Sequence, residues 1–197
     1  MKRWMATMLL FVAPITLADD VAEAFSAYIR GDYIVAFSAY QRAANRGNAG
    51  AQYNLGLMFL NGQGTNPDPR QAANWFQRAA DQGSAAAQRK LGMMYRDGLG
   101  VRKSQTAAFS LFEAAAMKRD SEAQFFLGIA FRDGHGIVQD FVRAHMWLNI
   151  SSASNNDARN LSAEFRDQLA VKMTPQQIAE AQRMARECLN SSYRKCD

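Results

Sequence analysis

Few side chains in this sequence could do chemistry, and the spacing of the histidines favours no metal site. The only histidines, His135 and His145, are ten residues apart, which does not fit a two-histidine helical metal motif. His135 stands between two glycines, and His145 lies two residues before Trp147. We interpret His135 as an exposed turn residue and His145 as a packed helix residue, so no metal and no cofactor are expected.

The carboxylates and glycines do not form a catalytic pattern either. Asp97 and Asp133 each precede a Gly-x-Gly turn, where Asn61 stands in an equivalent place, so local capping of the turn is the expected role. Phosphate-binding glycines lead from a strand into a helix, whereas these glycines end helices. No GxSxG, HExxH, CxxC or P-loop pattern is present. We therefore predict that the protein is not an enzyme.

The N-terminal residues 1–18 are typical of a secretory signal peptide. Lys2 and Arg3 supply the positive charge, an apolar stretch follows over 5–15, and Thr16-Leu17-Ala18 is a small-residue cleavage site. The alternative, a membrane anchor, is disfavoured because the apolar stretch is shorter than the roughly 20 residues that span a bilayer. We expect cleavage after Ala18 and a periplasmic or secreted protein with no membrane span in the mature chain.

Two further features depend on this location. An even number of cysteines in an oxidising compartment favours a disulfide between Cys188 and Cys196, although two free thiols on a tail remain the alternative. Removal of the first 18 residues leaves 21 basic and 18 acidic side chains, a net charge near +3. Because the basic residues are scattered rather than striped, no nucleic-acid partner is expected.

The clearest signal is one sequence motif that occurs three times. AQYNLGLMFLNGQG begins at Ala51, AQRKLGMMYRDGLG at Ala87 and AQFFLGIAFRDGHG at Ala123, a period of 36 residues. Such a period predicts a repeat architecture. The second copy places Ala87, Leu91 and Tyr95 on one helix face, and a second helical segment starts near Lys103 or Ser104. A glycine inside each first helix, such as Gly92, suggests close helix approach.

These residues resemble the Sel-one-like repeat family, a relative of the tetratricopeptide repeat. The resemblance rests on A-Q-x-x-L-G-x-x-[YF]-x-x-G-x-G followed by an Ala-rich helix, and it covers about 49–152. It implies an all-α, right-handed α-solenoid of stacked antiparallel helix pairs. We expect copies near 19–48, 49–84, 85–120 and 121–152, the first of them a shortened, tetratricopeptide-like cap.

The residues after the repeats predict a C-terminal capping helix pair over 153–190, followed by a tail over 191–197. Leu161, Phe165, Leu169 and Met173 recur at every fourth residue, which indicates an amphipathic helix. Thr174 and Gln177 flank Pro175 as a capping box that starts the last helix. An atypical end of this kind covers the last apolar face of a repeat array.

Residues that vary between copies are where binding specificity could lie. On the first helix of each repeat, the arc opposite the packed face mixes aromatic, basic and flexible apolar side chains, a composition typical of protein-contact surfaces. By resemblance to tetratricopeptide solenoids, first helices line the concave groove. The predicted partner-binding groove residues are Tyr53, Asn54, Leu57, Arg89, Lys90, Met93, Arg96, Phe125, Phe126, Ile129 and Arg132. The alternative is that the apolar row Leu57, Met93 and Ile129 packs internally.

The sequence therefore favours a non-catalytic adaptor that binds a peptide or helix of a cell-envelope protein. A scaffold of peptidoglycan or polysaccharide machinery, with Tyr53 and Phe125 stacked on sugars, is the second hypothesis. A hydrolase acting on cell-wall or β-lactam substrates is the third. One cysteine-rich branch of the family is associated with penicillin hydrolysis, but these repeats contain no cysteine, so that activity is not transferred.

Overall fold

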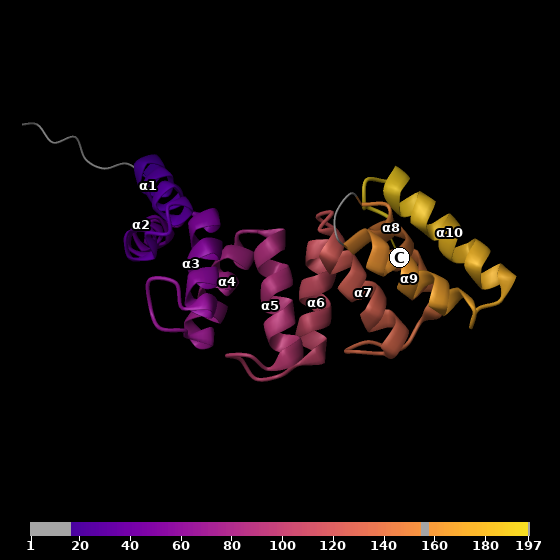
Figure 1. The fold of residues 1–197 in the computed structure, drawn as a ribbon. Helices are drawn as coiled ribbons and strands as arrows, with labels where there is room; N and C mark the ends of the chain where they lie inside the picture. The colour runs from indigo at the N-terminus through magenta and orange to yellow at the C-terminus, as the bar shows by residue number, and fades with distance from the viewer. Residues whose placement is uncertain (1–16, 155–157, 197) are drawn as a thin grey trace, which may run out of the picture.

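The computed structural model describes residues 17–154 and 158–196, and within them every regular element is an α-helix (Figure 1). The helix pairs follow one another along an elongated molecule, and consecutive helices pack together from α1 to α9, so the predicted all-α solenoid is confirmed. The helices are α1 Leu17–Ile29, α2 Tyr33–Asn45, α3 Ala49–Asn61, α4 Pro69–Asp81, α5 Ala85–Asp97, α6 Gln105–Ala116, α7 Ser121–Asp133, α8 Phe141–Ser152, α9 Ala158–Ala170 and α10 Pro175–Asn190.

Short polar side chains start the helices of the repeats. Asn48, Ser84 and Asp120 each accept a hydrogen bond from the backbone N–H three residues on, at the start of α3, α5 and α7. These caps satisfy donors that have no partner inside the helix. The same chemistry starts the second helices, where Ser104 accepts from the N–H of Ala107.

The glycines of the repeated motif are explained by close packing within and between repeats. A Cβ on Gly92 would lie 2.8 Å from the ring of Phe112, so α5 and α6 approach as the sequence suggested. Gly98 ends α5 in the left-handed conformation. Gly100 also has a positive φ, and its Cβ would lie 2.3 Å from the carbonyl oxygen of Pro69 at the start of α4. The second glycine thus allows contact with the preceding repeat.

The repeated glutamine joins consecutive repeats through a buried hydrogen bond. Gln52 donates from Nε2 to the carbonyl oxygen of Ala44, at 3.2 Å, and Gln124 donates to that of Ala116 at the same distance. Gln88 makes the equivalent contact with Ala80. Each bond satisfies a carbonyl near the end of the previous second helix. The glutamine therefore recurs as a structural joint.

The repeated apolar residues form the core. Leu55, Leu91 and Leu127 are buried in α3, α5 and α7, and they are surrounded by the alanines of the second helices. Burial of a leucine side chain of this size contributes roughly 2 kcal/mol. Packing thus accounts for the apolar residues that the copies of the motif share.

The C-terminal helices cover the last repeat, with two departures from the sequence prediction. The capping box of Thr174 and Gln177 is present, and α10 packs against α8. However, Leu161 is 44% exposed, and Met173 is buried but lies after the end of α9, so the predicted stripe on one helix holds for Phe165 and Leu169. Met173 still joins the C-terminal core, from the turn that follows α9.

The chain ends in the part of the molecule that α10 covers. Cys188 and Cys196 form a disulfide, with their Cα atoms 4.5 Å apart, and both are buried. The predicted signal peptide lies outside the described residues except for Leu17 and Ala18, which begin α1. In the described ranges, no helix combines the length and apolarity needed to cross a bilayer.

Candidate protein-binding groove

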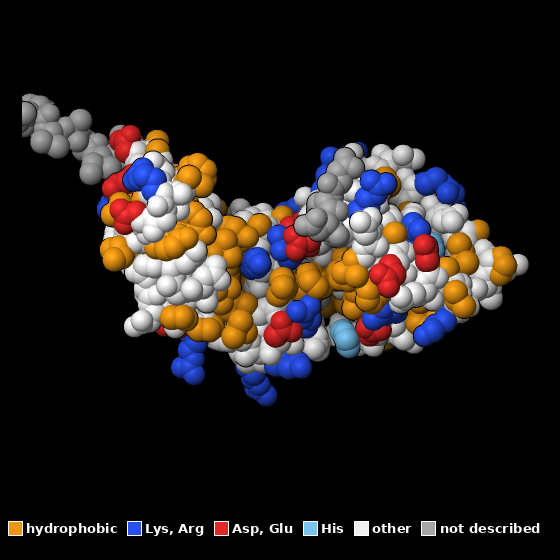
Figure 2. Space-filling view, in the orientation of Figure 1, with side chains coloured by type: hydrophobic (Ala, Val, Ile, Leu, Met, Phe, Trp, Pro, Cys, Tyr) orange, Lys and Arg blue, Asp and Glu red, His pale blue; other side chains and the backbone are white. Residues whose placement is uncertain are grey.

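The predicted groove residues lie on α3, α5 and α7, and all of them are half-buried. Figure 2 shows hydrophobic side chains in a band across the face that carries these helices, interrupted by basic and acidic groups. We call this face the groove face and define it by the eleven residues predicted above. The structure shows what surrounds each of them.

The N-terminal end of the groove face is hollowed and apolar. Asn54 and Leu57 of α3 line a cavity of about 250 Å³ together with Phe25 and Ile29 of α1. Phe25 and Ile29 are 60% and 69% exposed, which is unusual for large apolar side chains beside a hollow. Neither residue was predicted, because the groove prediction compared only the first helices of the three full copies and left out the shortened first copy.

Tyr53 is less available than its position suggested. Its ring centroid lies 5.7 Å from that of Phe76, and burial raises the pKa of the phenol. Lys90, at the position of α5 that corresponds to Asn54 in α3, is also half-buried. Tyr53 therefore packs partly against the core, and only the rest of its side chain is available to a partner.

Arg89 joins two repeats. Its Nε lies 2.9 Å from Oδ1 of Asp120, and its Nη1 lies 2.9 Å from Oε2 of Glu122. The Arg89 side chain is 11% exposed and that of Asp120 is 14% exposed, so this pair is largely shielded from water. The charge of Arg89 is thus balanced within the chain, and its guanidinium fixes α5 against α7.

The apolar row of Leu57, Met93 and Ile129 packs internally, and Leu57 also borders a hollow. Leu57 packs on the cluster between α4 and α5 and also lines the N-terminal hollow. Met93 and Ile129 pack against the C-terminal core. The internal-packing alternative therefore accounts for much of the row.

Arg96 and Arg132 occupy equivalent positions and build equivalent clusters. Arg96 donates from Nε and Nη2 to both carboxylate oxygens of Asp97, at 2.8 and 2.9 Å, and its guanidinium lies 5.0 Å from the ring centroid of Phe126. Arg132 binds Asp133 in the same way, at 2.7 Å for both bonds. These pairs lower the pKa of each carboxyl. The prediction that the two aspartates cap the turns is therefore wrong, because the adjacent arginines bind them.

The aromatic residues of α7 link the repeats to the cap. Phe126 stacks on Phe112 with centroids 5.0 Å apart. Phe125 meets Phe165 of α9 edge to face at 5.5 Å, and Arg132 lies 4.8 Å from the same Phe165 ring. The sequence predicted Phe165 on the apolar stripe of the capping helix, and the structure adds that its ring lies where the cap meets the groove face.

The remaining chemistry-bearing residues are dispersed. His135 is exposed, whereas His145 is buried, and burial together with Arg166 lowers its pKa against a weaker opposing effect of Asp167. No group of three or more His, Cys, Asp or Glu side chains that could hold a metal ion occurs within the ranges that the structure describes.

Helix pairs that stack one after another, each in contact with its neighbours, define an α-solenoid. The sequence matches the Sel1 repeat at 24–48, 49–84, 85–120 and 121–156, so the chain belongs to the Sel1 repeat family. Proteins of this family are generally protein-interaction scaffolds, and they are typically non-catalytic.

Two solved structures have a similar fold. The chain is similar to c5321, a protective antigen of uropathogenic Escherichia coli with an SLR fold, at a TM-score of 0.78 and 27% identity over 89% of this chain and 39% of that one. A Sel1 repeat protein from Oxalobacter formigenes shares the fold at a TM-score of 0.66, with 24% identity over 92% and 69% of the two chains.

Among curated proteins, the similarity is confined to a short stretch. The rat and mouse proteins named DAP3-binding cell death enhancer 1 are 51% and 52% identical to it, over 43 and 42 residues. These stretches cover 22% and 21% of this chain and 8% of each relative. They are about one repeat long, so they support the repeat and not a shared activity.

Proposed function

We propose that this chain is a non-catalytic scaffold of the cell envelope that binds a segment of a partner protein along its groove face. The observation that carries the proposal is the apolar hollow beside Phe25 and Ile29, where large side chains are exposed at one end of a continuous row of first helices. Exposed apolar residues around a concavity are typical of a contact surface.

The chemistry of the groove face suits an extended segment or an amphipathic helix. At the N-terminal end, Leu57 and Asn54 offer an apolar contact next to an amide that fixes orientation. Further along, Arg89 is held rigidly by its carboxylates, so the surface is preformed and little entropy is lost on binding. Affinity would come from many modest contacts.

Two features support a location outside the cytoplasm. The first 18 residues have the charge, apolar stretch and cleavage pattern of a signal peptide. Cys188 and Cys196 are bonded, and disulfides persist in oxidising compartments. Intact-mass analysis of the protein recovered from a periplasmic fraction tests this part. A chain that begins at Asp19 is expected, and an uncleaved chain retained in the cytoplasm would contradict the proposed location.

Binding is tested by pull-down from a cross-linked envelope fraction, using the chain from Asp19 onward. The double variant Phe25→Ser and Ile29→Ser removes the exposed apolar contacts of the hollow without touching the core. The matched control is Ile34→Ser with Val138→Ser, which removes side chains that are 73% and 83% exposed and line none of the described hollows.

The expected result is a protein recovered at least about tenfold less with the hollow variant than with either the unchanged chain or the control variant, from the loss of two buried apolar contacts. Equal recovery with all three proteins would show that this hollow is not part of the binding surface.

A further inference from the structure

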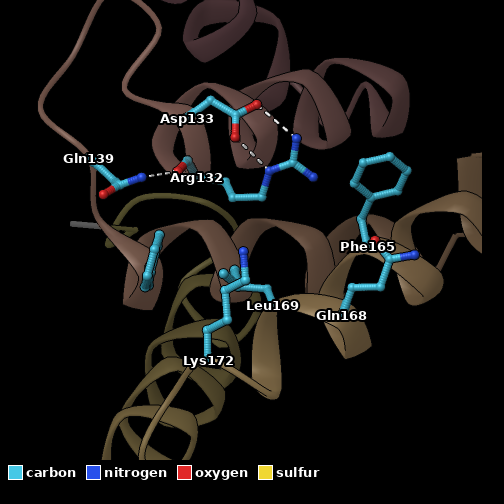
Figure 3. Close-up of a pocket in the computed structure, with 8 residues that line it drawn as sticks. Arg132, Asp133, Gln139, Phe165, Gln168, Leu169 and Lys172 are labelled. Carbon is cyan, nitrogen blue, oxygen red and sulfur yellow. Dashed lines mark hydrogen bonds and ion pairs between the residues drawn. The ribbon is translucent and has the colours of Figure 1, made fainter.

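A second hollow lies at the other end of the groove face, where the last repeat meets the C-terminal cap. Its volume is about 370 Å³. Arg132, Asp133 and Gln139 form one side, from the end of α7 and the turn that follows (Figure 3). Phe165, Gln168 and Lys172, from α9 and the turn after it, form the other side. The groove-face prediction included only Arg132 from this group.

The charges around this hollow leave one positive charge in excess. Arg132 is bound to Asp133 through Nε and Nη2. The ammonium group of Lys172 forms no ion pair within the described part of the chain. Lys172 adds to the effect of Arg132 in lowering the pKa of Asp133. An added carboxylate would therefore meet a net positive site with free N–H donors.

The polar groups beside the two cations are held in place. Gln139 donates from Nε2 to the carbonyl oxygen of Arg132 at 2.6 Å, and Gln168 donates to Glu164 at 3.1 Å. The guanidinium of Arg132 lies over the Phe165 ring. Asp133, the Phe165 ring and the turn held by Gln139 thus fix the position of the Arg132 guanidinium. The N–H groups of Arg132 that do not bind Asp133 are therefore held in place for a ligand.

The equivalent cluster one repeat earlier has no such space. The hollow beside Arg96 measures about 30 Å³, and large apolar side chains, among them Phe109, Phe126 and Ile129, line it. The same Arg–Asp pair thus lies against a packed interface at one junction and an open one at the other. The space at Arg132 belongs to the cap junction and is not a general property of the repeat.

The open hollow is continuous with the groove face. Phe165 contacts Phe125, a groove-face residue, and also lies under Arg132. A peptide that follows the first helices would therefore reach Phe165 and the two cations in turn. An apolar side chain would meet the aromatic ring just before a carboxylate meets Arg132 and Lys172.

We propose that this hollow binds a carboxylate of the partner segment, with Arg132 and Lys172 as its donors and the adjacent apolar residue packed on Phe165. The inference rests on the proposed binding function and adds the chemistry of the partner: an acidic group next to an apolar side chain. A C-terminal carboxylate and an Asp or Glu side chain share this chemistry.

Three acetylated tetrapeptides separate these sources. The first ends in Phe-Leu with a free carboxylate, the second is the same peptide amidated, and the third is amidated with Glu next to Phe. Titrations are followed by the side-chain amide NMR signals of Gln139 and Gln168, which line the hollow. Saturable shifts are expected with the first or third peptide, and binding at least about tenfold weaker with the second.

Matched variants test which cations act. Lys172→Met and Arg132→Met are each expected to weaken carboxylate binding at least about tenfold, whereas Arg183→Met, which removes an exposed cation of α10 that lines none of the described hollows, leaves it unchanged. Lys172→Arg is expected to restore binding. Preference for the free carboxylate would assign a chain terminus, and preference for the Glu peptide would assign an acidic side chain.

Equal shifts with the amidated peptide, no saturable shift with any peptide, or equal weakening by Arg183→Met would each overturn the inference. Lys172 is exposed, so Lys172→Met keeps the proposal testable even if Arg132→Met folds poorly. If the pull-down partner is retained by Lys172→Met but lost by the Phe25 and Ile29 variant, this inference fails and the proposed function stands. If the peptides bind but the Phe25 and Ile29 variant keeps its partner, the proposed N-terminal binding surface fails separately.

Discussion

The junction between two repeats and the junction between the last repeat and the cap use similar residues but differ in packing. Arg96 with Asp97 and Arg132 with Asp133 make the same pair of hydrogen bonds, and each arginine lies over a phenylalanine two helices further along the chain, Phe126 of α7 and Phe165 of α9. Yet the space beside them is about 30 Å³ in one case and about 370 Å³ in the other. The side chains that surround the ion pair, and not the pair itself, therefore determine how much space lies beside it.

The largest effect is expected where a repeat closes on its predecessor. Gly100→Ala would force a Cβ to within 2.3 Å of the Pro69 carbonyl oxygen at a residue with φ of 70°. We expect a loss of about 3–4 kcal/mol in the free energy of unfolding, from left-handed strain and overpacking together. Urea denaturation followed by circular dichroism measures it.

Gly47→Ala is the matched control, because Gly47 also has a positive φ but its Cβ would meet nothing within 4 Å. Its expected cost is about 1 kcal/mol, from strain alone. Equal costs at Gly47 and Gly100 would show that close contact between repeats does not require the second glycine.

At the cap, the disulfide is expected to matter next. Reduction opens a loop between two cysteines that are eight residues apart, and the chain-entropy relation predicts a loss of about 2.5 kcal/mol in the stability of the cap. Hydrogen exchange of α10 with and without reductant measures this loss. The variant Cys188→Ala with Cys196→Ala should show no response to reductant, and protection unchanged by reduction in the original chain would contradict the prediction.

Arg89→Met tests the ionic joint between repeats. The change leaves the shielded Asp120 without its cation, so we expect a loss of about 2 kcal/mol in the free energy of unfolding. Arg143→Met is the control, since Arg143 and Asp140 are 43% and 35% exposed and 3.8 Å apart, and its expected cost is below about 0.5 kcal/mol. If both variants cost the same, the Arg89 pair does not hold the repeats together.

The smallest effect is a pH dependence in the core beneath the cap. Burial lowers the pKa of His145 below its usual value of 6.5, so the unfolded chain binds a proton at higher pH than the folded chain. Its contribution to stability is therefore full above about pH 6.5 and falls as the pH drops towards the lower folded-state pKa.

Urea denaturation between pH 5 and pH 8 measures this slope. His145→Gln should flatten it near pH 6, whereas His135→Gln, which changes an exposed turn residue, should leave it unchanged. A slope that survives in His145→Gln would assign the titration to another group.

Much of the architecture could be predicted from the sequence because the determinants of a repeat are local. Helix spacing, caps such as Ser104 and the turn glycine Gly98 each act within a few residues, and the 36-residue period multiplies the signal. The function of Gln88 was less visible, since its partner Ala80 belongs to the preceding helix. A glutamine kept in every copy on a packed face was the signal that could have revealed it.

The candidate sites were predicted less completely. Arg89 and Phe125 were placed on the correct helices, but their internal partners Asp120 and Phe165 come from other repeats or from the cap. Whether an arginine faces a partner or its own carboxylate depends on the distance between helices. That distance is set by how the helices pack and cannot be read from the repeated motif.

The sequence by itself determined that this protein is a stack of helix pairs, because alanine, leucine and glycine recur at the positions where helices must meet. Only the tertiary structure decided that the Arg132 pair borders an open hollow while the Arg96 pair is packed closed. The reason lies in the side chains that line each space: Phe109, Phe126 and Ile129 border the small one beside Arg96, whereas Gln139, Gln168 and Lys172 border the large one beside Arg132. The same residue pair therefore serves as a joint in one place and as a candidate binding site in the other.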